Sequence, residues 1–297
     1  MINYKQLNQS IYNEIYLINQ DHSLNIFLCG ANPQKKKSLR ERINKLLDAD
    51  GKTNIVYPEW IFSDLLNDKD YNLLNLENEL AKSVDLIVIP LEGIGTIAEL
   101  GSFSSNKELL PKILILNEEK YKDEQNFINL GPLALIKDID KDNIKYYKKK
   151  VNEEKVIEEL VSKILNKRKI IDKYKLDNIF NLSRFLLFLI GIIQPVDKKQ
   201  IKDYLKEWNS KIPSFYVDPA IAILLKRNLI TFNTDQKKYI LSPKGHSLLY
   251  VQILPKQNSM RKFSEIRLEH LNYSLRKKKK FNIKAAKEWL LASKGVQ

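Results

Sequence analysis

The stretch LEGIGTIAELGS at residues 91–102 holds three glycines, a threonine and two acidic residues, of which Glu99 follows the glycine turn and could do chemistry. We expect Glu99 to lie in the first turn of a helix, where the helix dipole stabilises a carboxylate by about 0.3 to 1 kcal/mol. At the rim of a ligand cleft, the same carboxylate can attack or stabilise a ribose C1′ while its C–N glycosidic bond breaks. Composition alone does not choose between these two roles.

A buried strand and a helix must position this carboxylate. Apolar runs predict strands at residues 24–30, 53–58, 84–90 and 112–117. Amphipathic spacing predicts helices at residues 4–19, 38–49 and 59–82, and another that starts at IAELG. Apolar strands without alternation, separated by helices, are typical of a parallel sheet covered on both faces. We therefore predict an α/β domain with a flavodoxin- or Rossmann-like sheet over residues 1–170, continued to its end by a charged helical stretch.

The glycine turn is predicted to lie at the carboxyl edge of that sheet, where open α/β sheets bind their ligands. Gly93 and Gly95 allow a ligand to approach closely, and the backbone N–H groups of a helix start can hold a phosphate. The chain has neither a GxGxxG motif nor a phosphate-loop lysine here, which disfavours dinucleotide binding of the dehydrogenase type.

The composition indicates a globular protein of two domains, with 297 residues, 43% of them hydrophobic and 29% charged. The longest apolar run, FLLFLIGII at 185–193, is about half the roughly 20 residues that a membrane-spanning helix needs. No secretion signal is apparent, so we expect a cytoplasmic protein without a membrane partner. One cysteine and three scattered histidines predict neither a disulfide framework nor a metal site.

The positive charge belongs to the C-terminal half. Residues 1–150 carry 20 Lys and Arg against 22 Asp and Glu, a net charge of −2, whereas the remainder carries 30 against 14, a net charge of +16. Such asymmetry suggests that one half binds a polyanion, although lysines that are merely solvated would give the same count.

The C-terminal half is predicted to contain a winged helix. Helices at 172–193, 197–208 and 217–228, with Asp218 as the N-cap of the third, precede a hairpin at 229–243 and a further helix. In a winged helix, which we assign to residues 171–255, the third helix can lie in a DNA groove. A basic helical extension follows at 256–297. Candidate nucleic-acid contacts are Lys226, Arg227, Lys237, Lys238, Arg276, Lys277, Lys278, Lys279 and Lys280.

Several segments together carry a resemblance to a known family. They are IFLCG (26–30), LLNLENELAKSVDLIVIPLEGIGTIAELGSFS (73–104), FINLGPLALI (127–136) and RLEHLNYSLRKKKKFN (267–282). In their order and spacing, these segments resemble retron effectors of the Ec86 type, in which a nucleoside 2-deoxyribosyltransferase-like domain is joined to a DNA-binding region. The resemblance covers nearly the whole chain.

The resemblance implies roles for particular residues. The glutamate of the GTxxE element is the catalytic carboxylate of these domains, and it corresponds to Glu99. A further acid contacts the nucleoside, for which Glu77 matches best and Asp85 second, and Glu92 stands near the place of another. The implied substrate-binding residues are Gly30, Gly93, Gly95, Thr96 and Asn129, of which Asn129 lies in a segment that can reach a neighbouring subunit.

One departure from the transferase pattern bears on the reaction. Transferases usually carry a tyrosine at the end of the first strand, where this chain has Phe27, Leu28 and Cys29. The missing hydroxyl favours water as the acceptor, and thus a glycohydrolase acting on NAD+ or a related nucleotide without a separate cofactor. We interpret Cys29 as structural, because apolar neighbours raise the pKa of a thiol.

The resemblance also implies partners: a retron reverse transcriptase, its multicopy single-stranded DNA (msDNA) with the non-coding RNA, and further copies of this chain. Two other functions fit the same residues. One is a non-catalytic nucleic-acid-binding regulator whose α/β domain senses a nucleotide, and the other is a nucleoside 2-deoxyribosyltransferase.

Overall fold

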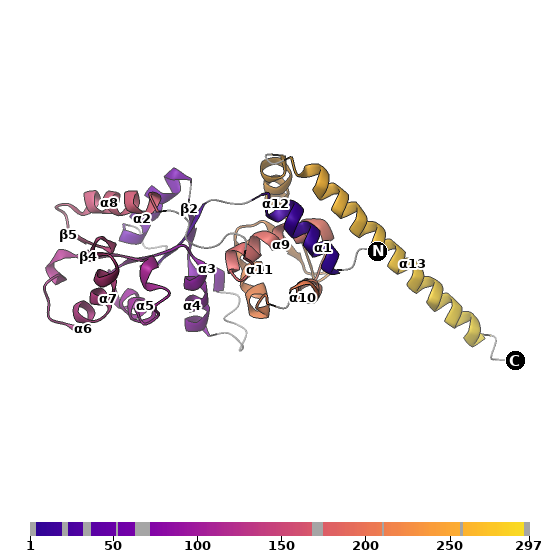
Figure 1. Cartoon of the computed structure of the whole chain (residues 1–297), viewed down its shortest axis with the longest axis horizontal. Coiled ribbons are helices and arrows are strands. Elements are labelled where there is room, and N and C mark those ends of the chain that lie inside the picture. Colours follow the sequence, from indigo (N-terminus) through magenta and orange to yellow (C-terminus); the bar gives the residue numbers. More distant parts are fainter. Residues whose placement is uncertain are drawn as a thin grey trace. The chain divides into compact units, whose positions relative to one another are not determined.

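The computed structural model describes residues 4–19, 23–31, 37–51, 53–62, 72–167, 175–209, 211–255 and 258–293. The chain forms two compact units, which we call the α/β unit and the C-terminal unit. The α/β unit comprises residues 21–180. The C-terminal unit comprises residues 181–297 together with residues 1–20 (Figure 1).

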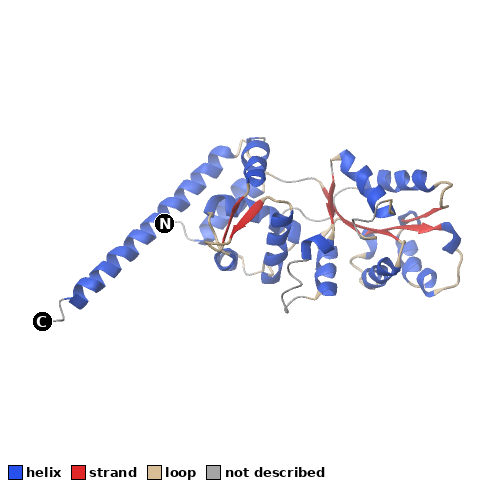
Figure 2. Ribbon diagram, turned by 180° about the vertical axis from the view of Figure 1, so that it is seen from behind, coloured by secondary structure: helices blue, strands red, loops and turns tan. Residues whose placement is uncertain are grey.

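The α/β unit is built on a five-stranded parallel sheet (Figure 2). Its strands are β1 (Leu24–Leu28), β2 (Thr53–Val56), β3 (Leu86–Pro90), β4 (Ile113–Glu118) and β5 (Ile144–Tyr147). They lie in the order β2-β1-β3-β4-β5, and Ile26 of β1 pairs with Ile55 on one side and Leu86 on the other. This order is that of doubly wound sheets. The strand order reverses at β1 and β3, because β2 lies on one side of β1 and the later strands are added on the other. The predicted α/β class is confirmed.

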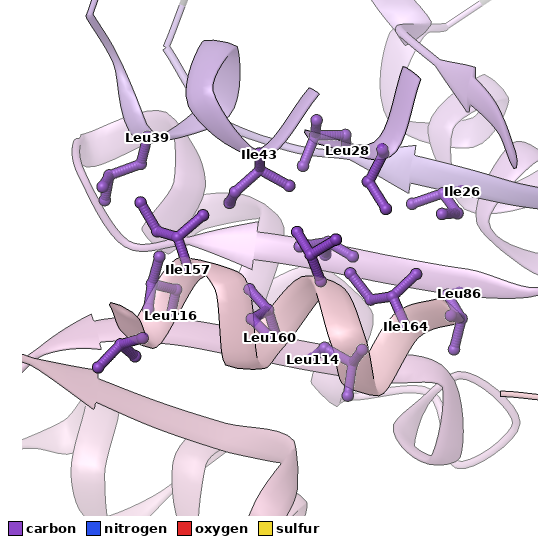
Figure 3. Packing of buried hydrophobic residues seen from close by; sticks show 14 of the residues in the cluster. Ile26, Leu28, Leu39, Ile43, Leu86, Leu114, Leu116, Ile157, Leu160 and Ile164 are labelled. Atoms are coloured by element: carbon purple, nitrogen blue, oxygen red, sulfur yellow. The ribbon is translucent and has the colours of Figure 1, made fainter. Parts of the chain in front are cut away.

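Helices cover both faces of the sheet (Figure 1). One face packs against α2 (Leu39–Asp50) and α8 (Glu153–Leu165), where Ile43 and Ile157 join side chains of β1, β3 and β4 in one buried cluster (Figure 3). The other face carries α4 (Leu73–Ser83), α5 (Ile94–Ser104) and α7 (Pro132–Ile139). Because both faces are buried, the strands are apolar throughout, as their sequences indicate.

The fifth strand was not expected, because its sequence IKYY lies within a charged stretch that we predicted to be helical. The strand lies at the edge of the sheet beside β4. Its two central residues are partly exposed, so this edge strand accepts a lysine that an inner strand would exclude. Helix α8 begins only at Glu153, after that strand.

The C-terminal unit contains mainly helices. They are α1 (Tyr4–Ser10), α9 (Ile179–Ile193), α10 (Lys198–Trp208), α11 (Val217–Lys226), α12 (Pro243–Ser247) and α13 (Met260–Ser293). Strands β6 (Ile230–Asn233) and β7 (Lys238–Leu241) form an antiparallel hairpin. Three helices followed by a hairpin match the predicted order, and the assignment as a winged helix stays an interpretation. Helix α13 is continuous where we expected two helices joined by a basic run.

The N-terminal helix belongs to this unit, so the predicted domain of residues 1–170 differs from the structure at its start. The Asn8 side chain donates a hydrogen bond to the Tyr204 carbonyl of α10 at 2.7 Å. Asn19 likewise donates to Ser259 at 2.8 Å. Periodicity identified an amphipathic helix there correctly, but periodicity does not say which neighbour covers its apolar face.

Helix α11 differs from expectation in two ways. It starts at Val217 rather than after Asp218, and the Asp218 carboxylate pairs instead with Lys198 and Lys202 of α10 at 3.3 and 3.1 Å. Residues 217–224 of the helix are all buried. The burial of these residues does not support an exposed recognition helix, and the placing of α11 in a DNA groove stays a prediction.

Gly245 of α12 lies where a larger residue does not fit. A Cβ atom at this position would come within 1.8 Å of the Leu229 carbonyl oxygen. That oxygen accepts a hydrogen bond from the Ser242 amide, so it cannot move freely. We predict that Gly245→Ala lowers the free energy of unfolding by about 1 to 3 kcal/mol, as overpacking does. Gly101→Ala, where the added Cβ meets nothing within 4 Å, is the control that keeps or raises stability in thermal unfolding.

Candidate active site

The contact between β1 and α5 places Glu99 beside the end of β1. The Phe27 ring packs edge-on against Phe103, with ring centroids 5.4 Å apart. Side chains recur on one face every two residues in a strand and about every four in a helix. Two residues further along β1 and four residues back along α5, Cys29 therefore meets Glu99. The two groups are close enough for the Glu99 charge to raise the pKa of the buried Cys29 thiol further than burial alone does.

Glu99 is the sixth residue of α5, so the expectation that it lies in the first turn is wrong. The helix dipole acts mainly within that first turn, and it does not account for a carboxylate further along. The Glu99 Oε2 atom is buried and has no hydrogen-bond partner among the described residues. Leaving such an oxygen unsatisfied costs stability. A purely structural role therefore does not explain this side chain.

A second carboxyl group, Glu77 of α4, lies close enough to Glu99 for their charges to repel. Burial first, and then the charge of Glu77, raise the pKa of Glu99 to about 7. Burial, followed by the charge of Glu59, raises the pKa of Glu77 to about 7 as well. Two carboxyl groups with pKa values near neutrality can hold a proton on one and a charge on the other at physiological pH. We call Glu99 and Glu77 the carboxyl pair.

One cation stands beside this acidic group. Arg40 of α2 is buried, with 1% of its side chain exposed, and it pairs with both oxygens of Glu59 at 2.8 and 3.1 Å. Its guanidinium also lies 4.5 Å from the centroid of the Tyr57 ring. The Arg40 charge lowers the pKa of Glu99 and opposes the larger effect of burial.

The loop after β1 is fixed by two charged side chains. Arg40 donates to the Ala31 carbonyl at 3.0 Å, and a Cβ atom on Gly30 would lie 2.8 Å from the Arg40 Cβ. Gly30 also has a φ of +138°, which other residues rarely adopt. Both oxygens of Glu92 accept backbone N–H groups, from Ala31 and Leu39, each at 3.1 Å. Glu92 and Gly30 thus shape the edge of the site.

Asp85 lies away from the carboxyl pair. It immediately precedes β3, whereas the glycine turn follows β3, so the two are at opposite edges of the sheet. Its Oδ2 atom accepts a hydrogen bond from the Asn25 amide at 2.9 Å. The structure therefore does not bring Asp85 together with Glu99, and its buried carboxylate ties the amino ends of β1 and β3 together.

The glycine turn is open. A Cβ atom on Gly93 or Gly95 would meet nothing within 4 Å, so packing within the chain does not require glycine at either position. The Thr96 hydroxyl donates to the Gly93 carbonyl at 2.7 Å and accepts from the Gly93 amide at 3.3 Å. Thr96 therefore holds the turn, and the two glycines leave space in front of it.

A pocket of about 480 Å³ lies on the other side of the turn, at the carboxyl ends of β3, β4 and β5. Its wall includes Glu92, Gly93 and Asn129. The Asn129 side chain donates to the carbonyls of Tyr121 and Glu124 at 2.7 and 2.8 Å, so it shapes the wall of this pocket within its own chain.

Sequence reasoning missed Glu59 and Arg40. Glu59 follows β2 by three residues, and an acid placed just after a predicted parallel strand is a signal for the carboxyl edge that we did not use. Arg40 gave no such signal, because an arginine at the start of an amphipathic helix is normally exposed.

The predicted nucleic-acid contacts are dispersed over the C-terminal unit. Lys226 and Arg227 stand at the end of α11, and Lys237 and Lys238 lie at the hairpin. Arg276 is exposed on α13. The side chains of Lys277, Lys278, Lys279 and Lys280 lie outside the described part of the structure.

The sheet and its carboxyl pair define an α/β protein with a candidate acid–base site at the carboxyl edge of β1 and β3. The family described as STM3845 retron effector protein matches residues 36–232. The chain therefore belongs to the STM3845 retron effector protein family, which confirms the predicted relation to retron effectors.

Two Escherichia coli proteins are similar to this chain. "Retron Ec86 putative ribosyltransferase/DNA-binding protein" is 26% identical over 278 residues, which are 87% of this chain and 88% of that protein. "Retron Ec73 putative ribosyltransferase/DNA-binding protein" is 34% identical over 117 residues, 37% of each chain. Among the described helices, none is long and apolar enough to cross a membrane.

The raised pKa values predict a pH-dependent stability. The Glu99 and Glu77 carboxyls release their protons near an ordinary pKa of 4.5 in the unfolded chain but near 7 in the folded protein. Between these pH values the folded state binds more protons than the unfolded chain does. The free energy of unfolding that the two carboxyls contribute is therefore lost as the pH rises from 4.5 to 7. Glu99→Gln removes a charge that is costly to bury, and should raise the free energy of unfolding by about 1 to 2 kcal/mol near pH 8.

The gain in the free energy of unfolding from Glu99→Gln should disappear near pH 4.5, where the Glu99 carboxyl of the native protein is protonated. Chemical denaturation at both pH values measures the difference. Glu79→Gln is the matched control on α4, because Glu79 forms an ion pair with Lys82 and does not belong to the carboxyl pair. A Glu99→Gln variant that loses stability equally at both pH values would contradict the prediction.

Proposed function

We propose that the protein is an antiphage retron effector whose α/β unit is an N-glycosidase acting on NAD+ or a related nucleotide. The observation that carries this proposal is the carboxyl pair, with two glutamates of raised pKa at the open carboxyl edge of a parallel sheet. Membership in a retron effector family and two relatives named as ribosyltransferases support glycosyl chemistry.

In the proposed reaction, ionised Glu99 attacks or stabilises the ribose C1′ while the C1′–N bond breaks. With NAD+ as substrate, the bonding electrons leave with the pyridine nitrogen, and nicotinamide departs as a neutral molecule. The oxygen of water then forms the new bond to C1′, and Glu77 accepts the proton that this water releases. The products are nicotinamide, ADP-ribose and one proton. Both roles need ionised carboxylates, Glu99 to face the developing cation and Glu77 to accept the proton, so the proposed rate rises as the pH passes the two pKa values near 7.

The rest of the nucleotide has space on both sides of the glycine turn. We propose that the backbone of Gly93 to Thr96, at the start of α5, holds a phosphate. The 480 Å³ pocket beyond it presents Ile94, Ile97 and Tyr121 together with Asn117 and Lys149, among other residues. Polar and charged residues, among them Glu92, Glu118 and Glu124, make up much of the rest of its lining, so apolar surface for a base stands beside hydrogen-bonding groups for its ribose.

The C-terminal unit is proposed to bind nucleic acid and so place the enzyme under the control of a reverse transcriptase–msDNA complex. The net charge of +16 on the C-terminal half and the words "DNA-binding" in the names of both relatives support this part. We further propose that the effector assembles with other copies of itself in the cytoplasm.

Two other functions remain testable against this proposal. A nucleoside 2-deoxyribosyltransferase would use the same pair but pass the sugar to a second base instead of water. A non-catalytic regulator would need neither carboxyl. The burial of Glu99 with an oxygen that has no hydrogen-bond partner among the described residues favours the catalytic alternatives, because it lowers stability and a sensor would not require it.

The first test of the function is turnover of NAD+ by the purified protein with its reverse transcriptase and msDNA. Glu99→Gln should lower the rate by about 10² to 10³-fold, because it removes the negative charge that faces the developing cation. Glu77→Gln should lower it by about 10²-fold and make the rise of rate through neutral pH shallower, since proton acceptance is lost while Glu99 must still ionise. Glu79→Gln, on the same helix, should keep the full rate.

Release of nicotinamide and of ADP-ribose, followed by chromatography, distinguishes hydrolysis from transfer to an added base. Equal rates for the native protein and Glu99→Gln would refute the enzyme assignment. In that case, toxicity in cells that survives Glu99→Gln but not charge reversal at Arg276 to Lys280 would favour the regulator.

A matched pair of glycines tests the open turn. Gly95→Ala places a methyl group in the space in front of the turn, and we expect the KM for the nucleotide to rise at least about tenfold while the fold is kept. Gly101→Ala, further along the same helix and equally free of contacts, should leave the KM unchanged. Replacing glycine by alanine inside a helix should also raise stability by about 0.5 to 1 kcal/mol. An unchanged KM for both variants would remove the turn from the substrate site.

A further inference from the structure

A second hollow, of about 350 Å³, lies wholly within the C-terminal unit. It is formed by the segment between α9 and α10, by α10 itself, by β7 and by the first half of α13. Its volume lies in the range of roughly 300 to 1,000 Å³ that is usual for pockets holding small molecules or parts of larger ones. None of its lining residues takes part in the site described above.

The walls of this pocket combine flat rings with apolar side chains. Tyr204, Tyr273 and His270 line it together with Pro195 and Leu271. The Tyr204 and His270 rings are 6.2 Å apart between centroids and tilted by 58°. These two rings are buried against each other, whereas the Tyr273 ring is partly exposed. Exposed aromatic rings are surfaces on which proteins stack the bases of unpaired nucleic acid strands.

Polar groups stand at the edges of the same rings. His270 is buried, with 8% exposed, and its Nε2 atom lies 3.4 Å from the Ser274 hydroxyl. Burial lowers the pKa of His270, so the ring is mainly neutral at physiological pH. A neutral imidazole and a hydroxyl each offer a donor and an acceptor, which suits the edge of a base better than a phosphate.

Positive charge is available at the rim. Lys238 lines the pocket from β7 and forms no ion pair within the described part of the chain. Arg276 follows Tyr273 by three residues on α13, so both lie on one side of that helix. The neighbouring Lys198 and Lys202, by contrast, pair with Asp218.

We propose that this pocket binds one unpaired base of a single-stranded nucleic acid, which stacks on Tyr273, with the buried Tyr204 as part of the pocket wall, and meets His270 and Ser274 at its edge. The flanking phosphates then contact Lys238 and Arg276. This inference rests on the proposed binding of nucleic acid by the C-terminal unit, and it adds the place and the manner of that binding. The alternative occupant of the pocket, a segment of a protein partner, becomes an outcome of the test.

Fluorescence anisotropy on the full-length protein can test the proposal with two labelled DNA probes. One is a short single strand of thymidines, and the other is the same backbone made entirely of abasic sites. We expect the native protein to bind the thymidine strand about tenfold more tightly, since one stacked base contributes roughly 1 to 3 kcal/mol. Tyr273→Ala should abolish this preference, and Tyr273→Phe, which keeps the ring, should retain it.

Charge variants separate the rim from the pocket. Lys238→Gln should weaken the binding of both probes equally and reduce the slope of log affinity against log salt concentration by about one. Lys244→Gln, an exposed lysine of α12 outside the pocket, should leave the preference for bases unchanged.

Equal affinities of the native protein for the two probes would overturn the proposal that the pocket binds a base, and so would a preference for the thymidine strand that survives Tyr273→Ala. A pocket made for a protein segment gives the first of these results. Binding of both probes with equal affinity would still leave the proposed binding of nucleic acid intact, and NAD+ turnover is measured independently. The two proposals can therefore fail separately.

Discussion

The guanidinium of Arg40 is the cation on which the acidic edge of the sheet depends. Glu99, Glu77 and Glu59 would otherwise face one another with only their own hydration to limit the repulsion. Arg40 is too deeply buried for its own charge to be hydrated. Its hydrogen bonds to Glu59 and to the loop carbonyls replace that hydration. Gly30 has no side chain because the arginine passes directly against it.

The arrangement sets the three carboxylates apart in their roles. Glu59 accepts two hydrogen bonds from the guanidinium, and 47% of its side chain is exposed. Among the described residues, no guanidinium pairs with Glu77 or Glu99, and both have raised pKa values. Perturbed groups of this kind concentrate in active sites, because a site tuned for chemistry is rarely tuned for stability.

Sequence reasoning reached the sheet and the two main carboxylates for different reasons. The strands could be predicted because burial on both faces leaves an apolar signature, whereas β5 could not, because an edge strand tolerates lysine. Glu99 was found through the turn that precedes its helix, although its place in that helix was misjudged by one turn. Asp85 was misplaced because a strand has two ends, and only residues after the strand reach the ligand edge of a parallel sheet.

Relations between distant segments escaped prediction. Arg40 and Glu59 meet across 19 residues, and Asn8 meets Tyr204 across 196, without any motif that joins them. Such contacts depend on which faces pack together, and one sequence carries that information only weakly. The burial of α11 is of the same kind: the order of elements suggested a helix for a DNA groove, while residues 217–224 are buried in the structure.

The acidic edge also bears on the choice of substrate under the proposed reaction. A nicotinamide ring attached to ribose carries a positive charge, which two glutamates attract before any bond breaks. As the bond breaks, that charge passes from the ring to the ribose carbon. A carboxylate fixed beside C1′ therefore stabilises the transition state more than a carboxylate beside the ring would. A neutral purine nucleoside has no charge to pass on and must be protonated before it leaves. A carboxyl pair with pKa values near 7 can do either, but the first reaction needs only the ionised form of Glu99 and a proton acceptor.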